Sequence, residues 1–278
     1  MRKMWDMRVA SAFIALGLLI LLASSAHAQE VLRLRLGTAI VGSGISKVLL
    51  PAFTRDSGMV VDVSAGGSGP SLRDARSGAI DVLFINAPEA EQAFMADGAG
   101  VMRKPVMSDY YIIVGPIGDP ADVANARDAV EAFRRIARTQ SNFVSRGDDS
   151  GNNQEELSIW QKAGIQPYGD WYFETGLGVS PSLDIASERE AYMLVDQATW
   201  LHARAAGKNR LKPVFDGSKT LPDLYSVIAV NPSEHPAVNL KRARRFVDWL
   251  TSRPAQDIIR QFQINGVHPY RPAADQGG

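Results

Sequence analysis

The chain of 278 residues contains no cysteine. This absence excludes disulfide bonds, thiolate metal sites and cysteine nucleophiles. An excess of charge is also lacking, because 30 basic residues balance 30 acidic ones and the formal net charge is +0. The chain therefore has no electrostatic field that would attract nucleic acid or an anionic lipid surface. With 45% hydrophobic residues it can bury an ordinary core, which must hold the fold together.

The sequence patterns of several enzyme classes are absent as well. H-E-x-x-H, G-x-S-x-G and the D-x-D-x-D-G calcium loop do not occur, nor do the G-x-G-x-x-G and P-loop patterns of nucleotide sites. Beyond the first 28 residues, His202, His235 and His268 have no partner at metal-ligand spacing. We therefore predict a protein that is not an enzyme and that carries no cofactor and no metal cation.

A long apolar run occurs once, at residues 9–22. Basic residues precede it, and Ala26 and Ala28 form the small-x-small pattern of a cleavage site. The run is short for a membrane span, and without a cysteine after it a lipoprotein anchor is excluded. We predict a signal peptide at 1–28 that is removed on export to the periplasm. A retained N-terminal anchor is the alternative.

After residue 28, short apolar runs alternate with amphipathic stretches, which is typical of an α/β fold with a parallel sheet. The candidate strands are 31–36, 59–63, 81–85, 110–114, 142–144, 191–195 and 225–230. The candidate helices are 43–53, 68–76, 88–94, 128–138, 153–163, 180–187, 199–206, 240–250 and 254–262. Glycine- and serine-rich turns follow Leu36, Val63 and Val144. Because such sheets bind ligands at the carboxyl ends of their strands, these three turns should converge on one site.

The segment 143–153 has the pattern of a buried strand that runs through a glycine turn into a helix. Arg146 supplies a positive charge after the strand, Ser150 stands at the helix start, and glycines at 147 and 151 let the backbone approach a ligand. Free amides and the positive end of the helix dipole meet there, which predicts an anion site. An ordinary helix capped by Asp148, Asp149 or Ser150 is the alternative.

The other two turns offer further hydrogen-bond donors. Thr38 and Ser43 lie in the glycine-rich segment 37–44, and Ser68 stands at a helix start within 65–71. We predict that all three hydroxyl groups contact the ligand. Packing of the chain in the first turn, and helix capping in the second, are the alternatives.

Several segments of the chain resemble one family, the tungstate-binding component of ABC importers. They are Val144-Ser145-Arg146-Gly147-Asp148-Asp149-Ser150-Gly151, Gly169-Asp170-Trp171-Tyr172, Val227-Ile228-Ala229-Val230-Asn231-Pro232 and Asp248-Trp249-Leu250-Thr251-Ser252. The resemblance runs from about Leu34 to Pro272. It departs from the family at the first strand end, where Thr38 alone is retained, and at Asn152, where the family tends to have threonine.

The resemblance implies a two-lobed type II periplasmic binding protein fold of the α/β class, in which two hinge strands cross between the lobes. The strands at 110–114 and 225–230 are placed to be the crossings. The implied organisation is lobe one at 29–112 and 228–272, lobe two at 113–227, and a disordered tail at 273–278.

The resemblance also implies a function, which is to capture a tetrahedral oxyanion between the lobes and deliver it to an ABC permease in the inner membrane. The expected ligand is tungstate, and the expected state is a monomer that binds no nucleic acid. Arg146 would supply the counter-charge, and the two lobes would supply the remaining donors. The implied donors are Ser150, Gly151 and Asn152 from lobe two, and Thr38, Ser43 and Ser68 from lobe one.

Two alternatives stay open at this point. One is a phosphate- or molybdate-binding protein of the same fold, and the other is an oxyanion sensor subunit. Phosphate carries a proton and would need an acceptor, for which Asp148 and Asp149 are candidates. We expect these two carboxylates rather to cap the helix or to pair with Arg146.

Overall fold

The computed structural model describes residues 31–207, 210–233 and 235–275. The predicted signal peptide at 1–28 lies outside these residues. Among the described residues, no helix is both long enough and apolar enough to span a bilayer.

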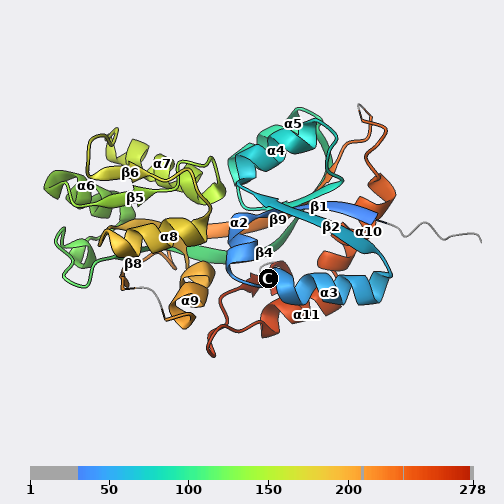
Figure 1. Ribbon diagram of the computed structural model, residues 1–278. Helices are drawn as coiled ribbons and strands as arrows, with labels where there is room; N and C mark the ends of the chain where they lie inside the picture. Colours follow the sequence, from blue (N-terminus) through green and yellow to red (C-terminus); the bar gives the residue numbers. More distant parts are fainter. Residues whose placement is uncertain (1–30, 208–209, 234, 276–278) are drawn as a thin grey trace, which may run out of the picture. The chain divides into compact units, whose positions relative to one another are not determined.

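Strands and helices alternate along the chain, as the sequence pattern predicts (Figure 1). The strands are β1 (Val31–Gly37), β2 (Val60–Gly66), β3 (Val82–Ile85), β4 (Gly100–Gly115), β5 (Phe143–Ser145), β6 (Tyr172–Glu174), β7 (Met193–Asp196), β8 (Lys212–Asp216), β9 (Pro222–Val230) and β10 (Arg271–Pro272). The α-helices are α2 (Thr38–Gly42), α3 (Ser46–Ser57), α4 (Ser68–Arg76), α5 (Pro88–Ala96), α6 (Ala129–Thr139), α7 (Gly151–Ala163), α8 (Val179–Glu188), α9 (Gln197–Ala205), α10 (Leu240–Leu250) and α11 (Arg253–Gln261). The short 3₁₀ helices are η1 (Val123–Asn125) and η2 (Ala273–Asp275).

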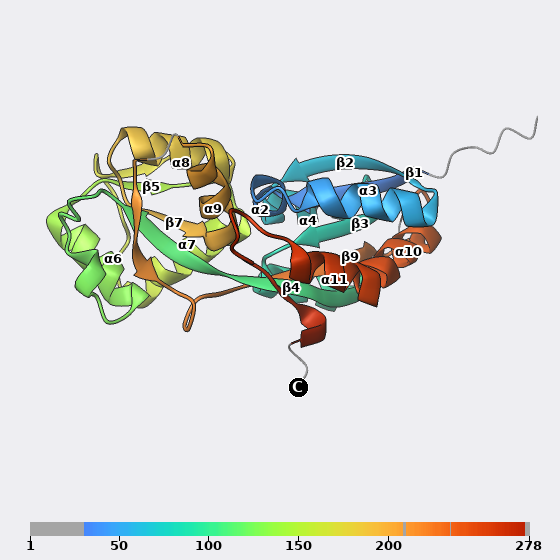
Figure 2. The same cartoon turned by 90° about the horizontal axis from the view of Figure 1, so that it is seen from below.

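The strands β4 and β9 connect the two lobes. They pair antiparallel with each other from Gly100 to Tyr110 of β4. Beyond that point, β4 pairs with β7 and β8 in lobe two, and Figure 2 shows it running from one lobe into the other. The two-lobed α/β fold with crossing strands is therefore confirmed.

The main sheet is mixed, whereas the sequence pattern predicts a parallel one. Parallel pairing holds for β1 with β2 and for β1 with β3. By contrast, β9 is antiparallel to both β3 and β4. A strand that is buried on both faces shows the same apolar run in either direction, so its direction leaves no trace in the pattern.

Each lobe has a hydrophobic core of its own. In lobe one, Leu34 of β1 packs in a cluster with Phe53 of α3 and Phe246 of α10. In lobe two, the rings of Phe133 and Trp160 lie 4.4 Å apart, each with Phe143 at 5.3 Å. Separate cores let each lobe keep its packing if the strands between them bend.

The predicted limits of the lobes, 29–112 with 228–272 and 113–227, stay a prediction. The crossing strands contribute side chains to both cores, since Tyr225 of β9 packs in lobe one and Tyr111 of β4 packs in lobe two. Any limit within these two strands is therefore a matter of definition.

The segment 273–278, predicted to be disordered, begins instead with η2. The backbone N–H of Ala274 donates a hydrogen bond to Oε1 of Gln256 on α11, at 3.1 Å, which fixes this turn. Residues 276–278 lie outside the described part of the chain.

Candidate functional site

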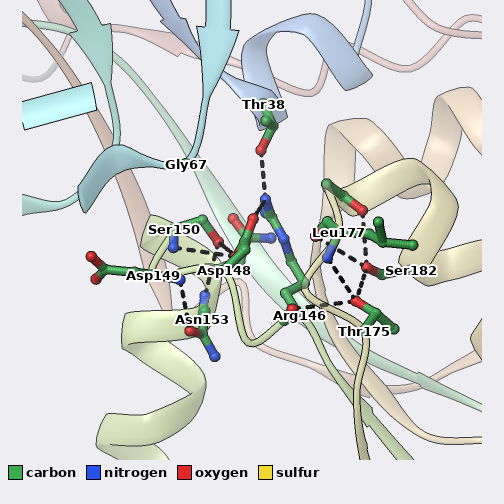
Figure 3. Close-up of polar contacts among 12 residues, drawn as sticks. Thr38, Gly67, Arg146, Asp148, Asp149, Ser150, Asn153, Thr175, Leu177 and Ser182 are labelled. Atoms are coloured by element: carbon green, nitrogen blue, oxygen red, sulfur yellow. Dashed lines mark hydrogen bonds and ion pairs between the residues drawn. The ribbon is translucent and has the colours of Figure 1, made fainter. Parts of the chain in front are cut away.

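Arg146 stands where β5 ends, between the two lobes. Its side chain is 2% exposed. Nη2 donates to Oγ1 of Thr38 in lobe one, at 2.6 Å, and to Oδ2 of Asp148, at 2.5 Å (Figure 3). The predicted pairing of Asp148 with Arg146 is thus confirmed, and the structure brings Thr38 and Arg146 together from opposite lobes.

The other nitrogen atoms of the Arg146 guanidinium lack partners. Nε and Nη1 are buried and make no hydrogen bond with any described residue. A buried charged donor without an acceptor is costly, and such groups are usually satisfied by a ligand, an ion or water. Because a guanidinium binds oxyanions strongly, these two nitrogen atoms mark a place for an anion.

The start of α7 lies beside Arg146, as predicted. Ser150 is its N-cap, and its Oγ accepts a hydrogen bond from the backbone N–H of Asn153. The Ser150 hydroxyl donates in turn to Oδ1 of Asp148, at 2.6 Å. Gly151 comes next, and its backbone lies against the loop after β3, because a Cβ atom there would come within 1.7 Å of the Asn86 carbonyl oxygen.

The start of α4, in lobe one, contacts the loop that precedes α7 and carries Asp148 and Asp149. Gly67 caps this helix without a side-chain hydrogen bond, and the buried Oγ of Ser68 has no partner among the described residues. The backbone N–H of Gly69 donates to the Asp149 carbonyl oxygen, at 2.9 Å, across the lobes. Ser68 therefore lies near the loop that carries Asp148, and among the described residues its hydroxyl group has no hydrogen-bond partner.

Thr38 and Ser43 lie at opposite ends of α2, a five-residue helix where the sequence predicts a turn. Thr38 begins the helix and accepts a hydrogen bond from Arg146. Ser43 is fully buried at the other end, and its Oγ donates to the carbonyl oxygen of Ile40, at 3.2 Å. The structure thus brings Thr38 to Arg146 and gives the Ser43 hydroxyl a local partner; ligand contact by either stays a prediction.

Asn152 is buried in the first turn of α7 and contacts a second carboxylate. Its Nδ2 donates to Oδ2 of Asp196 at 3.4 Å, while its Oδ1 has no partner among the described residues. Asp196 caps α9, where its Oδ1 accepts from the Thr199 backbone N–H at 2.8 Å. Asp196 and Thr199 were not predicted as site residues from the sequence. The rule that ligands bind at strand ends would have indicated them, because Asp196 ends β7.

Two further residues that the sequence analysis missed hold the backbone of Arg146. Oγ1 of Thr175 donates to the Arg146 carbonyl oxygen, at 3.2 Å, and lies 2.7 Å from Oγ of Ser182 on α8 (Figure 3). Because Thr175 joins the Arg146 backbone to Ser182, the position of Arg146 is fixed from α8 as well as from β5.

Glu156 on α7 lies beneath the site, buried under Ser145. It accepts hydrogen bonds from Oγ of Ser145 at 2.7 Å, the hydroxyl of Tyr172 at 2.8 Å and Nε1 of Trp160 at 3.1 Å. Burial nevertheless raises the pKa of Glu156 from its ordinary 4.5 to about 7. Desolvation penalises the ionised form by more than these hydrogen bonds compensate.

The raised pKa of Glu156 predicts a pH dependence of stability. Between about pH 4.5 and about 7 the native state binds the proton and the unfolded state does not, so the free energy of unfolding falls as pH rises. Glu156→Gln removes this slope, and its stability relative to the parent should increase by about 2–3 kcal/mol from pH 5 to pH 8. Urea unfolding of both proteins at the two pH values measures the difference. Parallel stability curves would contradict the assignment.

Within the described residues, no group of three or more His, Cys, Asp or Glu side chains is arranged to hold a metal ion. A cavity of about 520 Å³ opens beside α7 between the lobes, with Glu89, Gly151, Glu155, Lys162 and Asp223 among its lining residues. Its lining carries more acidic than basic side chains, so it is less suited to an anion than the surroundings of Arg146 are.

Comparisons with known proteins show the family and the fold of the chain. The sequence signature described as a PBP superfamily domain matches residues 23–254. The tungstate-binding protein TupA of Peptoclostridium acidaminophilum is 37% identical over 227 residues, which cover 81% of this chain and 79% of that protein. The chain belongs to the PBP superfamily, in the family of the tungstate-binding proteins.

Solved structures of this family have the same fold. The crystal structure of the tungstate ABC transporter from Geobacter sulfurreducens is 40% identical, with a TM-score of 0.75, and the match covers 84% of this chain and 99% of that one. The tungstate-binding protein TupA from Desulfovibrio alaskensis G20 is 33% identical, with a TM-score of 0.70, and the match covers 87% and 98%. These matches confirm the family and the type II fold that the sequence resemblance implies.

Proposed function

We propose that this protein binds a tetrahedral oxyanion dianion, with tungstate as its physiological ligand, in the site around Arg146. The observation that carries the proposal is the pair of buried, unpartnered nitrogen atoms of Arg146 at the contact between the lobes. The relatives that share its family are named as tungstate-binding proteins, which supports the choice of ion.

The donors around Arg146 come from both lobes. In our proposal Thr38, Ser43 and Ser68 act from lobe one, and Ser150, Gly151 and Asn152 act from lobe two. A dianion loses its hydration shell only where each oxygen atom receives new donors, so a shell shared by two lobes favours the closed form. The site would thus convert ligand binding into closure of the lobes.

The state of Asp148 favours a fully deprotonated ion over hydrogen phosphate. One of its oxygen atoms accepts from Arg146 and the other from Ser150, so both are already engaged. Asp149 pairs with Arg73 instead, at 2.7 Å. The proton of hydrogen phosphate would have to compete with these hydrogen bonds for an acceptor, whereas tungstate and molybdate need donors only.

We further propose that the mature protein acts in the periplasm as the binding component of an ABC importer. Closure around the ion would present the loaded form to a permease in the inner membrane. The proposed site only binds and releases the ion. The hydrogen-bond donors described above are sufficient for this, and no activated nucleophile is needed.

Isothermal titration of the ligand-stripped mature protein with sodium tungstate tests the proposed function. We expect tight 1:1 binding of tungstate, with sodium phosphate weaker by at least about a hundredfold, because the proton of phosphate would compete with Arg146 and Ser150 for the oxygen atoms of Asp148. Sodium molybdate and sodium sulfate complete the series. Tight phosphate binding without tungstate binding would contradict the assignment of the ion.

A further inference from the structure

The side-chain amide of Asn152, one of the proposed donors, has its NH₂ group directed to a carboxylate. Its Oδ1 is buried without a partner among the described residues, and its Nδ2 is directed to Asp196. A carbonyl oxygen repels an anion, whereas the NH₂ group on the other side of the same amide would donate to it. After a turn of the amide by about 180°, both N–H donors would leave Asp196 and could serve the ion.

The charge of Asp196 decides whether this turn can occur. An ionised carboxylate is an acceptor only, so it holds Nδ2 of Asn152 and would oppose Oδ1. A protonated carboxyl group has one O–H donor, which could hold Oδ1 and leave the NH₂ group free to face the ion. Asp196 is fully buried, so its contact with Asn152 is shielded from bulk solvent.

The surroundings of Asp196 favour protonation. Burial raises its pKa, while Arg146 acts in the opposite direction. Two more buried carboxylates face it from the crossing strands, Asp109 of β4 and Asp223 of β9, which lie opposite each other in the β4–β9 ladder. Their negative charges repel that of Asp196, and burial raises the pKa of Asp223 to about 7.

Three buried tyrosines also belong to this cluster. They are Tyr111 of β4, Tyr225 of β9 and Tyr270, and burial raises the pKa of each well above its ordinary range. They therefore stay neutral and supply no counter-charge. The positive charge of Arg146 lowers the pKa of Asp196. An anion bound at Arg146 would offset this charge and so favour protonation of Asp196.

We propose that Asp196 takes up one proton from solvent when the oxyanion binds, donates it in a hydrogen bond to Oδ1 of Asn152, and so turns the NH₂ group of Asn152 toward the ion. Asp196 is then a positioning residue that acts through Asn152. The inference rests on the proposed function, because it needs an anion at Arg146.

This coupling has a definite sign. If binding takes up a proton, affinity is greatest at low pH and falls as pH rises between the pKa of Asp196 in the free and in the bound protein.

The test is titration calorimetry with sodium tungstate at pH 7 and pH 9, in two buffers at each pH whose ionisation enthalpies differ. We expect a net uptake of protons at one or both pH values and an affinity about tenfold lower at pH 9 than at pH 7. Asp196→Asn keeps an N-cap for α9 and supplies a permanent donor to Asn152. This variant should lose the uptake and should bind about tenfold more tightly than the parent at pH 9.

Two further variants make the test specific. Asn152→Ala should bind more weakly and also lose the uptake, because the group that Asp196 positions is gone. Glu156→Gln removes another buried carboxyl group of raised pKa and should leave the uptake unchanged. Tungstate binding by the parent without proton uptake, or uptake that persists in Asp196→Asn, would overturn the inference and leave the proposed function intact. Absence of tungstate binding at either pH would overturn the proposed function, and the inference with it.

Discussion

Arg146→Ala should weaken tungstate binding by roughly a hundred- to a thousandfold, or about 3–4 kcal/mol, the largest loss expected for a single residue. The substitution removes the buried formal counter-charge together with the unpartnered Nε and Nη1 donors. It also removes the hydrogen bond to Thr38 that joins the two lobes. Titration calorimetry of the parent and the variant measures the loss, with circular dichroism to verify that the variant is folded.

Two controls separate these contributions. Arg146→Lys keeps the positive charge and loses the planar set of donors, so its affinity should fall between the parent and the alanine variant. Arg73→Ala removes another arginine that bridges the lobes, through an exposed ion pair with Asp149. Because exposed pairs contribute about 0–1 kcal/mol, this variant should bind within about fivefold of the parent. Near-normal binding by Arg146→Ala would refute the proposed site.

The sequence predicted most of the elements because their patterns are local. α4 and α10 were predicted with the bounds that the structure has, and the other main helices were predicted to within a few residues. Missed elements are short or exposed, such as β6 (Tyr172–Glu174) and β8 (Lys212–Asp216), where few residues carry a pattern. The first half of β4 was missed as well, because Arg103 and Lys104 interrupt its apolar run.

The arrangement of the candidate site was predictable in part, for the same reason. Arg146, Ser150 and Gly151 were proposed because a charge, a cap and a glycine follow one strand within a few residues, and the structure places them together there. Asp196 was missed because its contact with Asn152 joins positions 44 residues apart. The charge cluster of Asp109 and Asp223 arises from strand register, which sequence spacing does not reveal.

The glycine-rich segment 37–44 shows a second reason why ligand contacts are hard to predict from a single sequence. The sequence has the glycine-rich composition of a ligand-binding turn at 37–44, but the structure places α2 there. A Cβ atom at Gly42 would approach Oγ1 of Thr199 to 3.1 Å, so this glycine permits close packing of α2 against α9. A glycine needed for packing and one needed for a ligand look alike in a single sequence.

Gly151→Ala should weaken tungstate binding by roughly a hundredfold, or about 3 kcal/mol, by opposing contact between the lobes. A Cβ atom at this position would lie 1.7 Å from the backbone carbonyl oxygen of Asn86, and Gly151 and Asn86 belong to different lobes. The backbone oxygen cannot rotate away as a side chain would, so the lobes themselves must separate. Because the proposed donors are divided between the lobes, separation removes part of the shell around the ion.

Loss of binding through separation of the lobes can be distinguished from a folding defect, because the strain falls between the lobes and not within lobe two. Gly151 lies in the first turn of α7, where alanine is a better helix former than glycine, so lobe two should fold as well as before. Gly118→Ala is the matched control, since its added Cβ atom meets nothing within 4 Å and binding should be unchanged. Small-angle X-ray scattering with excess tungstate should show a larger radius of gyration for Gly151→Ala than for the parent. Equal radii together with equal affinities would mean that the approach of Gly151 to Asn86 is not required for binding, and that the anion shell does not depend on contact between the lobes.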